Sequence, residues 1–250
     1  MKYLRPLVIA TGIVLGWQVI VWLAETPPYI LPGPALVAER WVERAPLILG
    51  HAWVTLAEIV LGLVIGAACG AVSALTMAFF RPARAWLLPV LVVSQAIPVF
   101  TLAPILVLWL GYGMLSKVAM AVLIIYFPVT ATFYDGLKRT ETGWLDLAAT
   151  MGASGFTTLL RIRVPAALPA FASGLKVAAA AAPIGAVVGE WVGSSAGLGY
   201  LMLHANGRMQ IDLTFAALLT LAVIAVAVYF TVDRLARMLV PWQVESGPAE

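Results

Sequence analysis

Residues 146–165 read DLAATMGASGFTTLLRIRVP, and this stretch between two long apolar runs decides how the rest of the sequence is interpreted. It sets seven residues at fixed intervals: a group of three, then three residues and a glycine, then nine residues and an isoleucine, then one residue and a Val-Pro pair. These frame residues are Asp146, Leu147, Ala148, Gly152, Ile162, Val164 and Pro165. Such a stretch is either an ordinary connection with surface helices or a docking element for another protein.

The first half of this stretch has helical spacing. Trp144, Leu145, Ala148 and Ala149 stand at positions i, i+1, i+4 and i+5, which predicts a short amphipathic helix with one apolar face. Gly152 follows, and glycine adopts positive φ angles that other residues resist. We therefore expect the chain to turn at Gly152.

The second half predicts another short helix after the turn. Ser154 is a suitable N-cap, and Phe156, Leu159 and Leu160 supply apolar positions. Pro165 cannot donate a backbone hydrogen bond inside a helix, so we expect this helix to end there.

Outside this stretch, the composition is that of a membrane protein, with 62% hydrophobic and only 11% charged residues. A membrane-spanning helix needs about 20 mostly apolar residues. Charge-poor runs of roughly that length occur at 7–24, 54–79, 86–110, 118–132, 171–188 and 213–232. We therefore predict an all-α integral membrane protein, surrounded by lipid, with about six spanning helices in a single transmembrane domain over residues 1–250. Pro128 is expected to interrupt the fourth helix.

The basic residues predict the orientation of these helices. The first run is too long for a secretory signal and has no cleavage pattern, so it is taken as a retained span. Ten basic residues then share one side: Lys2, Arg5, Arg81, Arg84, Lys138, Arg139, Arg161, Arg163, Arg234 and Arg237. Four fall on the other side: Arg40, Arg44, Lys117 and Arg208. Basic residues prefer cytoplasmic loops, which places both termini and the 146–165 stretch in the cytoplasm. This bias explains the net charge of +3 without nucleic-acid binding.

The sequence offers little for catalysis. His51 and His204 lie near the predicted outer surface without an accompanying acidic pair, and Ser194-Ser195 lies in a glycine-rich turn. No G-x4-G-K-[ST] phosphate loop occurs. The lone Cys69 is expected to be a small packing residue. We therefore expect neither enzymatic activity nor a metal or cofactor bound by this chain.

Several helical positions suggest packing or a route for solute. Gly62, Gly66 and Gly70 recur every fourth residue, and such a stripe lets another helix approach closely. Pro98 and Pro104 kink the third run, either to line a pathway or to shape static packing.

The fifth run contains two further candidates. Pro183 lies in a stretch of alanine and glycine that suits a subunit contact or space for a solute. Glu190 follows near the outer end, where an ionisable group is costly. It is expected either to accept backbone N–H bonds from residues 193–199 or to contact the solute. Glu58 and Lys176 are similar cases, and Lys176 is expected to snorkel to the cytoplasmic interface.

The frame closely resembles the signature E-A-A-x3-G-x9-I-x-L-P of the membrane subunits of bacterial ABC importers. Three positions depart conservatively: Asp146 replaces Glu, Leu147 replaces Ala and Val164 replaces Leu. Further landmarks resemble permeases of the nitrate, taurine and alkanesulfonate family: 31–34 (LPGP), 96–98, 102–104, 111–113, 116–117, 189–190 and 197–200.

The resemblance implies a type I ABC importer permease fold in the bacterial inner membrane, with a coupling helix in the loop at about 134–170. It implies a homodimer working with two ATPase subunits, which bind Mg-ATP, and a periplasmic or lipid-anchored solute-binding protein. Residues 189–202 look most like permeases for thiamine-precursor pyrimidines, with sulfonate, taurine or nitrate as other solutes. The alternative is an ion-coupled secondary transporter, which would be expected to show repeated halves and charged segments within the membrane.

Overall fold

The computed structural model describes residues 4–242, with side chains from Val8 onward, and its ordered elements within these residues are helices and turns. In chain order they are α1 (Leu4–Leu23), α2 (Pro34–Glu43), α3 (Ala45–Phe79), α4 (Arg81–Ala96), α5 (Val99–Leu110), α6 (Met114–Lys138), α7 (Thr142–Thr150), α8 (Gly155–Thr158), the π-helical η1 (Leu159–Arg163), α9 (Val164–Gly193), α10 (Leu198–Gly207) and α11 (Ile211–Leu239). The prediction of an all-α membrane fold is confirmed.

The six predicted apolar runs all fall on helices, but the helices are not six equivalent spans. Among the described residues, α3, α6, the continuous unit from α8 to α9, and α11 are long and apolar enough to cross a membrane. The pair α4 and α5 passes the same test together, although the two helices meet at an angle of 104°. The apolar part of α1, Val8–Leu23, is shorter. Among the described residues this gives four clear spans, or five if the bent pair is one span, with α1 as a further, shorter apolar helix beside the roughly six that were predicted.

The bend between α4 and α5 occurs at a proline. Ile97 is extended, with ψ 117°, and Pro98 is the N-cap of α5. A residue that precedes proline is disfavoured in the α conformation because its backbone meets the proline ring. The third apolar run is therefore two helices and not one kinked helix.

Two other predicted helix breaks are wrong. α6 runs through Pro128 without interruption. The second predicted helix continues past Pro165 into α9, and the reason lies in the preceding π turn. There the N–H of Val164 bonds the carbonyl of Leu159, a five-residue spacing. A proline loses one helical hydrogen bond and crowds a carbonyl in the preceding turn, and the wider π turn provides room for this.

The core is built on α6, which lies between α3 and α9. A Cβ atom placed on Gly62 would come within 2.5 Å of Ala121, and one on Gly66 within 2.7 Å of Ile125. On the other side, a Cβ on Gly185 would lie 2.8 Å from the Cα of Ala121. Small residues on α3 and α9 therefore let both backbones approach α6 closely.

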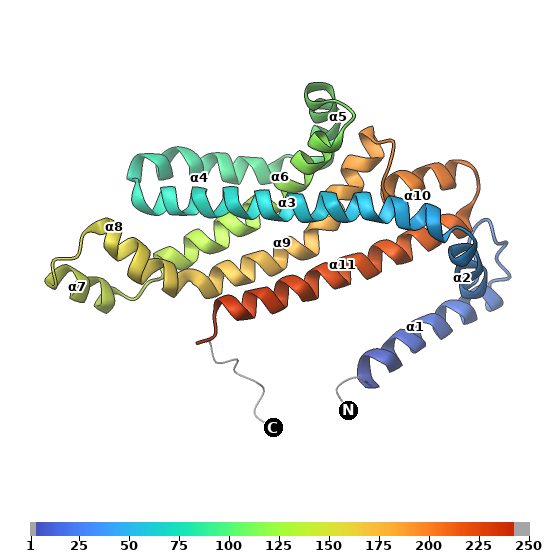
Figure 1. Cartoon of the computed structure of the whole chain (residues 1–250), viewed down its shortest axis with the longest axis horizontal. Helices are drawn as coiled ribbons and strands as arrows, with labels where there is room; N and C mark the ends of the chain where they lie inside the picture. The colour runs from blue at the N-terminus through green and yellow to red at the C-terminus, as the bar shows by residue number, and fades with distance from the viewer. Residues whose placement is uncertain (1–3, 243–250) are drawn as a thin grey trace.

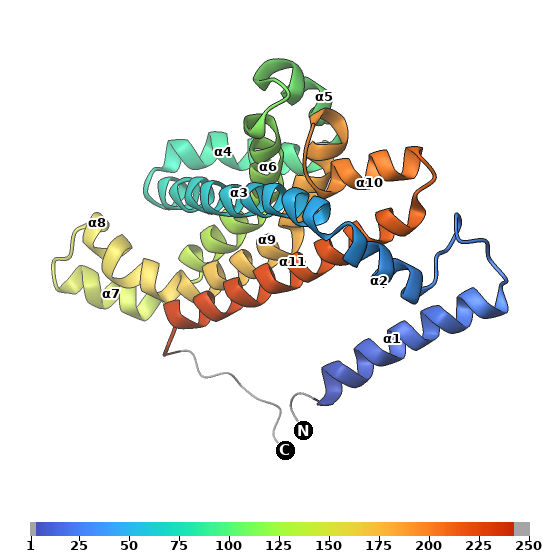
Figure 2. The same ribbon diagram turned by 45° about the vertical axis from the view of Figure 1, so that its right-hand side comes forward.

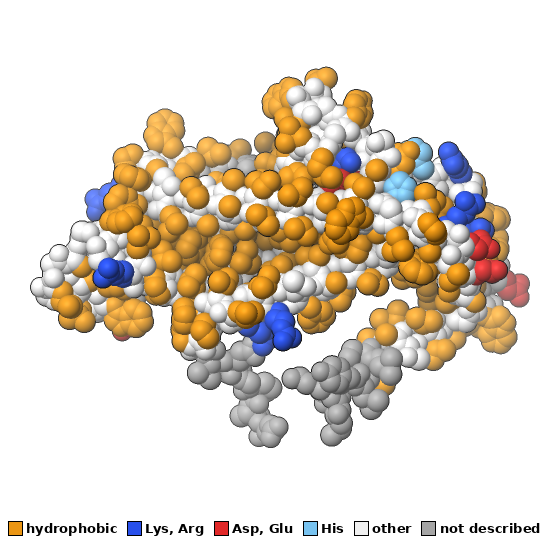
Figure 3. Space-filling view, in the orientation of Figure 1, with side chains coloured by type: hydrophobic (Ala, Val, Ile, Leu, Met, Phe, Trp, Pro, Cys, Tyr) orange, Lys and Arg blue, Asp and Glu red, His pale blue; other side chains and the backbone are white. Residues whose placement is uncertain are grey.

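The helices form an elongated bundle (Figure 1). α7 and α8 lie at one end, here called the loop end, while α2 and α10 lie at the other, here called the far end (Figures 1 and 2). α1 extends away from the bundle, although Trp17 stacks on Phe215 of α11 with ring centroids 5.6 Å apart. Hydrophobic side chains cover most of the face seen in Figure 3, which suits a surface in contact with lipid.

Candidate functional site

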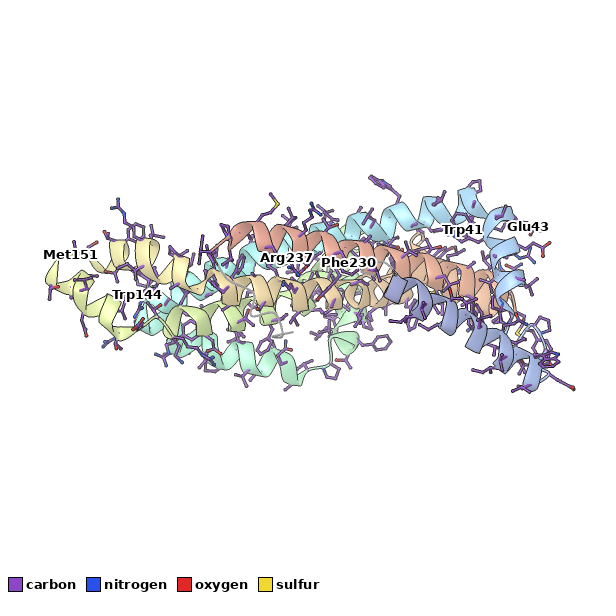
Figure 4. The ribbon with its side chains drawn as sticks, turned by 90° about the horizontal axis from the view of Figure 1, so that it is seen from below. Trp41, Glu43, Trp144, Met151, Phe230 and Arg237 are labelled. Atoms are coloured by element: carbon purple, nitrogen blue, oxygen red, sulfur yellow. The ribbon has the colours of Figure 1, made fainter. Side chains whose placement is uncertain are left out.

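At the loop end, α7 presents an apolar surface that lies outside the long spanning helices. Trp144, Leu147 and Met151 are 52%, 61% and 77% exposed, and Figure 4 shows Trp144 and Met151 at this extremity. Ala148 is buried and Leu145 is half-buried. The predicted helix is therefore confirmed, but only Leu145 and Ala148 of its predicted apolar face turn inward, while Trp144 and Ala149 are exposed.

The turn after α7 depends on Gly152. Its φ is +74°, a conformation that glycine adopts without steric cost. The Gly152 N–H bonds the carbonyl of Ala149 at 3.0 Å, and the Ala153 N–H bonds that of Ala148 at 2.9 Å. These two bonds form a Schellman motif, which satisfies carbonyl groups at the end of α7. The prediction of a turn at this glycine is confirmed.

The start of α8 is also as predicted. Ser154 is its N-cap, and its hydroxyl accepts a hydrogen bond from the N–H of Thr157 at 3.2 Å. The turn and the cap together fix the direction in which the chain leaves α7 and enters the continuous helix that becomes α9.

A hollow of about 430 Å³ lies between α7, the start of α9 and the end of the described chain. Its lining residues are Trp144, Leu147, Ala148, Met151, Arg161, Ile162, Pro165, Ala166 and Trp242. The structure thus brings four frame residues together around one hollow: Leu147, Ala148, Ile162 and Pro165. Asp146, Gly152 and Val164 lie outside that lining; Asp146 is exposed, and Gly152 acts through the backbone turn.

In the half of the bundle nearer the far end, Glu190 is buried and hydrogen-bonded, as one of the two expectations for it required. Its Oε1 accepts the hydroxyl of Thr55 at 2.6 Å, and its Oε2 accepts the N–H of Gly199. Thr55 in turn accepts the N–H of Leu198 at 2.8 Å, and His51 Nδ1 accepts that of Gly197 at 3.0 Å. Side chains from α3 and α9 therefore satisfy three successive N–H groups at the start of α10.

A buried ion pair that sequence reasoning missed lies next to this network. Lys117 Nζ is 3.0 Å from Glu58 Oε1, and the two side chains are 6% and 0% exposed. The count of basic residues predicts Lys117 on the outer side, whereas the structure places it within α6. The signal that could have found the pair is Glu58 itself, because an ionisable group within an apolar run requires a partner.

The remaining candidates are not brought together. Pro98 and Pro104 are exposed on α5, whereas Pro183 is buried in α9. Lys176 does not simply extend to the interface, since its Nζ lies 2.6 Å from Asp233 Oδ1 on α11. That contact joins α9 to α11.

At the far end, α2, which is not a span, is held to the first turn of α11 by charge. Arg40 Nε donates to Asp212 Oδ2 at 2.7 Å, and Arg40 Nη1 donates to Glu43 Oε2 at 2.7 Å. The hydrogen bond to Asp212 raises the pKa of Arg40 above its ordinary value.

The structure is thus a bundle of apolar helices, several of them long enough to cross a membrane, with a capped helical loop at one end. The sequence profile of the binding-protein-dependent transport system inner membrane components matches residues 58–244, and the chain belongs to this family.

The similar proteins are permeases by name. A probable ABC transporter permease protein of Haemophilus influenzae is 56% identical over 97% of this chain and 99% of its own. The formylaminopyrimidine transport permease protein ThiX of Halalkalibacterium halodurans is 38% identical over 86% of this chain and 87% of its own. The riboflavin transport system permease protein RibX of Chloroflexus aurantiacus is 36% identical over 91% of this chain and 85% of its own.

The fold is that of the type I ABC importer permeases. An inward-facing structure of the MetNI methionine ABC transporter aligns with a TM-score of 0.63 and 19% identity, covering 79% of this chain and 98% of that one. The chain is thus a permease subunit of an ABC importer for small solutes. As in its family, it is an inner-membrane component that works with an ATPase and a binding protein.

Proposed function

We propose that two copies of this chain form the translocation pathway of an ATP-driven importer and dock on two ATPase subunits through the loop of residues 146–165. The observation that carries this proposal is the exposed apolar face of α7, where Trp144, Leu147 and Met151 face outward from a helix that is not itself a span. Large exposed apolar groups outside lipid mark a protein contact. Mg-ATP binds to the partner subunits, and this chain binds no cofactor.

A continuous helical unit that leads from the loop into the opposite half of the bundle supports this proposal. Residues 155–193 form one unbroken helical unit, which begins at the Ser154 cap and contains Glu190 near its other end. Closure of the ATPase pair would move α7, and this unit would transmit the movement as a rigid body. The binding protein, free in the periplasm or lipid-anchored, delivers solute to the outer side.

For the solute, we propose a thiamine-precursor pyrimidine. Support comes from the 38% identity to a permease named for formylaminopyrimidine, over most of both chains. Among the relatives described above, the riboflavin permease, which is 36% identical, favours riboflavin as a different solute. The test is calorimetric titration of the cognate binding protein with a formylaminopyrimidine, riboflavin, taurine and an alkanesulfonate. Tight binding of the pyrimidine alone supports the proposal, and tight binding of a sulfonate or riboflavin instead overturns it.

Docking is tested by purifying the tagged chain from its native membrane in mild detergent and measuring co-purified ATPase activity and solute uptake. Ala148→Arg places a large cation at a buried position of α7, and we expect it to insert into the membrane but to lose the ATPase and uptake. Gly207→Arg adds the same charge at the far end, where a Cβ placed on this glycine would meet no atom within 4 Å, and serves as the control.

The alternative, an ion-coupled secondary transporter, predicts a different dependence on energy. Uptake that survives a hydrolysis-deficient ATPase but stops when the proton gradient is collapsed would favour that alternative. Normal uptake by Ala148→Arg would likewise contradict the docking role of the loop.

A further inference from the structure

Three helices bring one ionisable side chain each to the same apolar region of the bundle. Glu58 on α3 and Lys117 on α6 form the ion pair described above. Glu190 on α9 is 1% exposed. The transport proposal gives none of these charges a role, and ionisable groups inside a membrane protein are retained at a cost.

The charges of this cluster do not balance. Two carboxylates and one ammonium leave one negative charge in excess, which is unfavourable in a buried site. Among the described residues, Lys117 is the cation that pairs with Glu58. His51 lies two turns away on α3, and its Nδ1 accepts the Gly197 N–H. That nitrogen is therefore unprotonated, and His51 does not supply a second positive charge.

The hydrogen bonds point to the missing charge. Thr55, whose hydroxyl binds Glu190, precedes Glu58 by three residues on α3, so both carboxyl groups lie in the same buried region. An ionised carboxylate only accepts hydrogen bonds. The oxygens of Glu190 already accept from Thr55 and Gly199, whereas neither oxygen of Glu58 has a neutral donor among the described residues. Two ionised carboxylates in one buried region beside a single lysine repel each other, and a proton on one of them relieves this repulsion.

We propose that Glu58 and Glu190 share one proton, so that with Lys117 they form a neutral proton-binding site that joins α3, α6 and α9. This site is separate from the docking loop and does not depend on the identity of the solute. While the proton is bound, the network holds Glu190 in the position from which it accepts the Gly199 N–H.

The direct test is infrared spectroscopy of the full-length permease with its ATPase subunits in lipid bilayers. At neutral pH, the wild type should show the carbonyl band of a protonated carboxylic acid, shifted by exchange into D2O. Glu58→Gln should remove this band, because Lys117 then balances Glu190 alone. Glu43→Gln, which changes a glutamate with a half-exposed side chain on α2, should leave the band in place.

Thermal unfolding against pH gives an independent measurement. Raising the pH until the proton leaves should lower the unfolding temperature of the wild type, because two negative charges then face one lysine. Glu58→Gln should lack this alkaline loss. A wild type without a protonated carboxyl band, or a band that persists in Glu58→Gln, overturns the proposal. If Glu58→Gln fails to fold, the wild-type spectrum still decides.

Discussion

Thr55 on α3 donates a hydrogen bond to Glu190 on α9 at 2.6 Å and accepts one from the N–H of Leu198 at 2.8 Å. One hydroxyl thereby connects three helices in a region where Thr55 and Glu190 are almost completely buried. Because no lipid group can replace a lost partner there, each bond of this hydroxyl contributes to the position of α10.

Replacing Thr55 by valine keeps the shape of the side chain and removes both hydrogen bonds. It leaves a buried N–H at Leu198 and one oxygen of Glu190 without their partner, which costs about 1–3 kcal/mol. We expect the free energy of unfolding to fall by that amount, measured by denaturant titration in lipid nanodiscs. Thr76→Val, on the same helix, removes only a bond to the carbonyl of Val72 and should have a much smaller effect. Equal losses in the two variants would contradict the role given to Thr55.

The contact between α3 and α6 predicts a position-specific effect of a single methyl group. In Gly62→Ala, the new Cβ would lie 2.5 Å from the Cβ of Ala121, so the two helices must separate. Overpacking of this kind costs about 1–3 kcal/mol. Gly50→Ala, earlier on α3, meets no atom within 4 Å and should leave stability unchanged or raise it by up to about 1 kcal/mol. Thermal unfolding of both variants in nanodiscs checks this; a stable Gly62→Ala would show that the helices are not in close contact.

Local features of the fold were predictable from the sequence. Gly152 and Ser154 act within a few residues of their own positions, through a positive φ and an N-cap, so residue type alone predicted both. The stripe of Gly62, Gly66 and Gly70 was recognisable by its period, but the sequence did not say which helix it meets. The stripe packs against α6, and this contact is set by tertiary packing.

Features that depend on contacts between residues far apart in the sequence were not predictable. Pro128 and Pro165 have the same chemistry as Pro98, yet only the chain at Pro98 breaks into two helices. The π turn that accommodates Pro165 has no signal in residue type. Lys117 was likewise misplaced, because its basic charge was counted toward topology while its partner, Glu58, lies 59 positions earlier in the sequence.

The turn at Gly152 predicts that coupling depends on backbone conformation and not on side-chain volume. No atom lies within 4 Å of a Cβ placed on this glycine, but its φ is +74°. Valine resists that conformation, at a cost of roughly 1–2 kcal/mol, whereas asparagine visits it more readily. We expect Gly152→Val to lose solute-stimulated ATP hydrolysis in the assembled transporter and Gly152→Asn to retain most of it.

Gly143 provides the matched control for this pair of variants. It lies in the first turn of α7, also with no atom within 4 Å of a Cβ, and it has no positive φ. Gly143→Ala should therefore behave as the wild type. If Gly152→Asn and Gly152→Val were equally impaired, the defect would come from the added side chain at the docking surface, and the conformational explanation would be wrong.

The orientation of the chain gives the last prediction, which uses its single cysteine. In a Cys69→Ala background, Glu43→Cys places a thiol at the far end, and Thr142→Cys places one at the start of α7 at the loop end. The excess of basic residues on the loop side predicts that this end is cytoplasmic. A membrane-impermeant maleimide added to intact cells should therefore label Glu43→Cys and should reach Thr142→Cys only after permeabilisation. Labelling of Thr142→Cys in intact cells would place the docking loop outside, where no ATPase could reach it, and would contradict the proposed function together with the orientation.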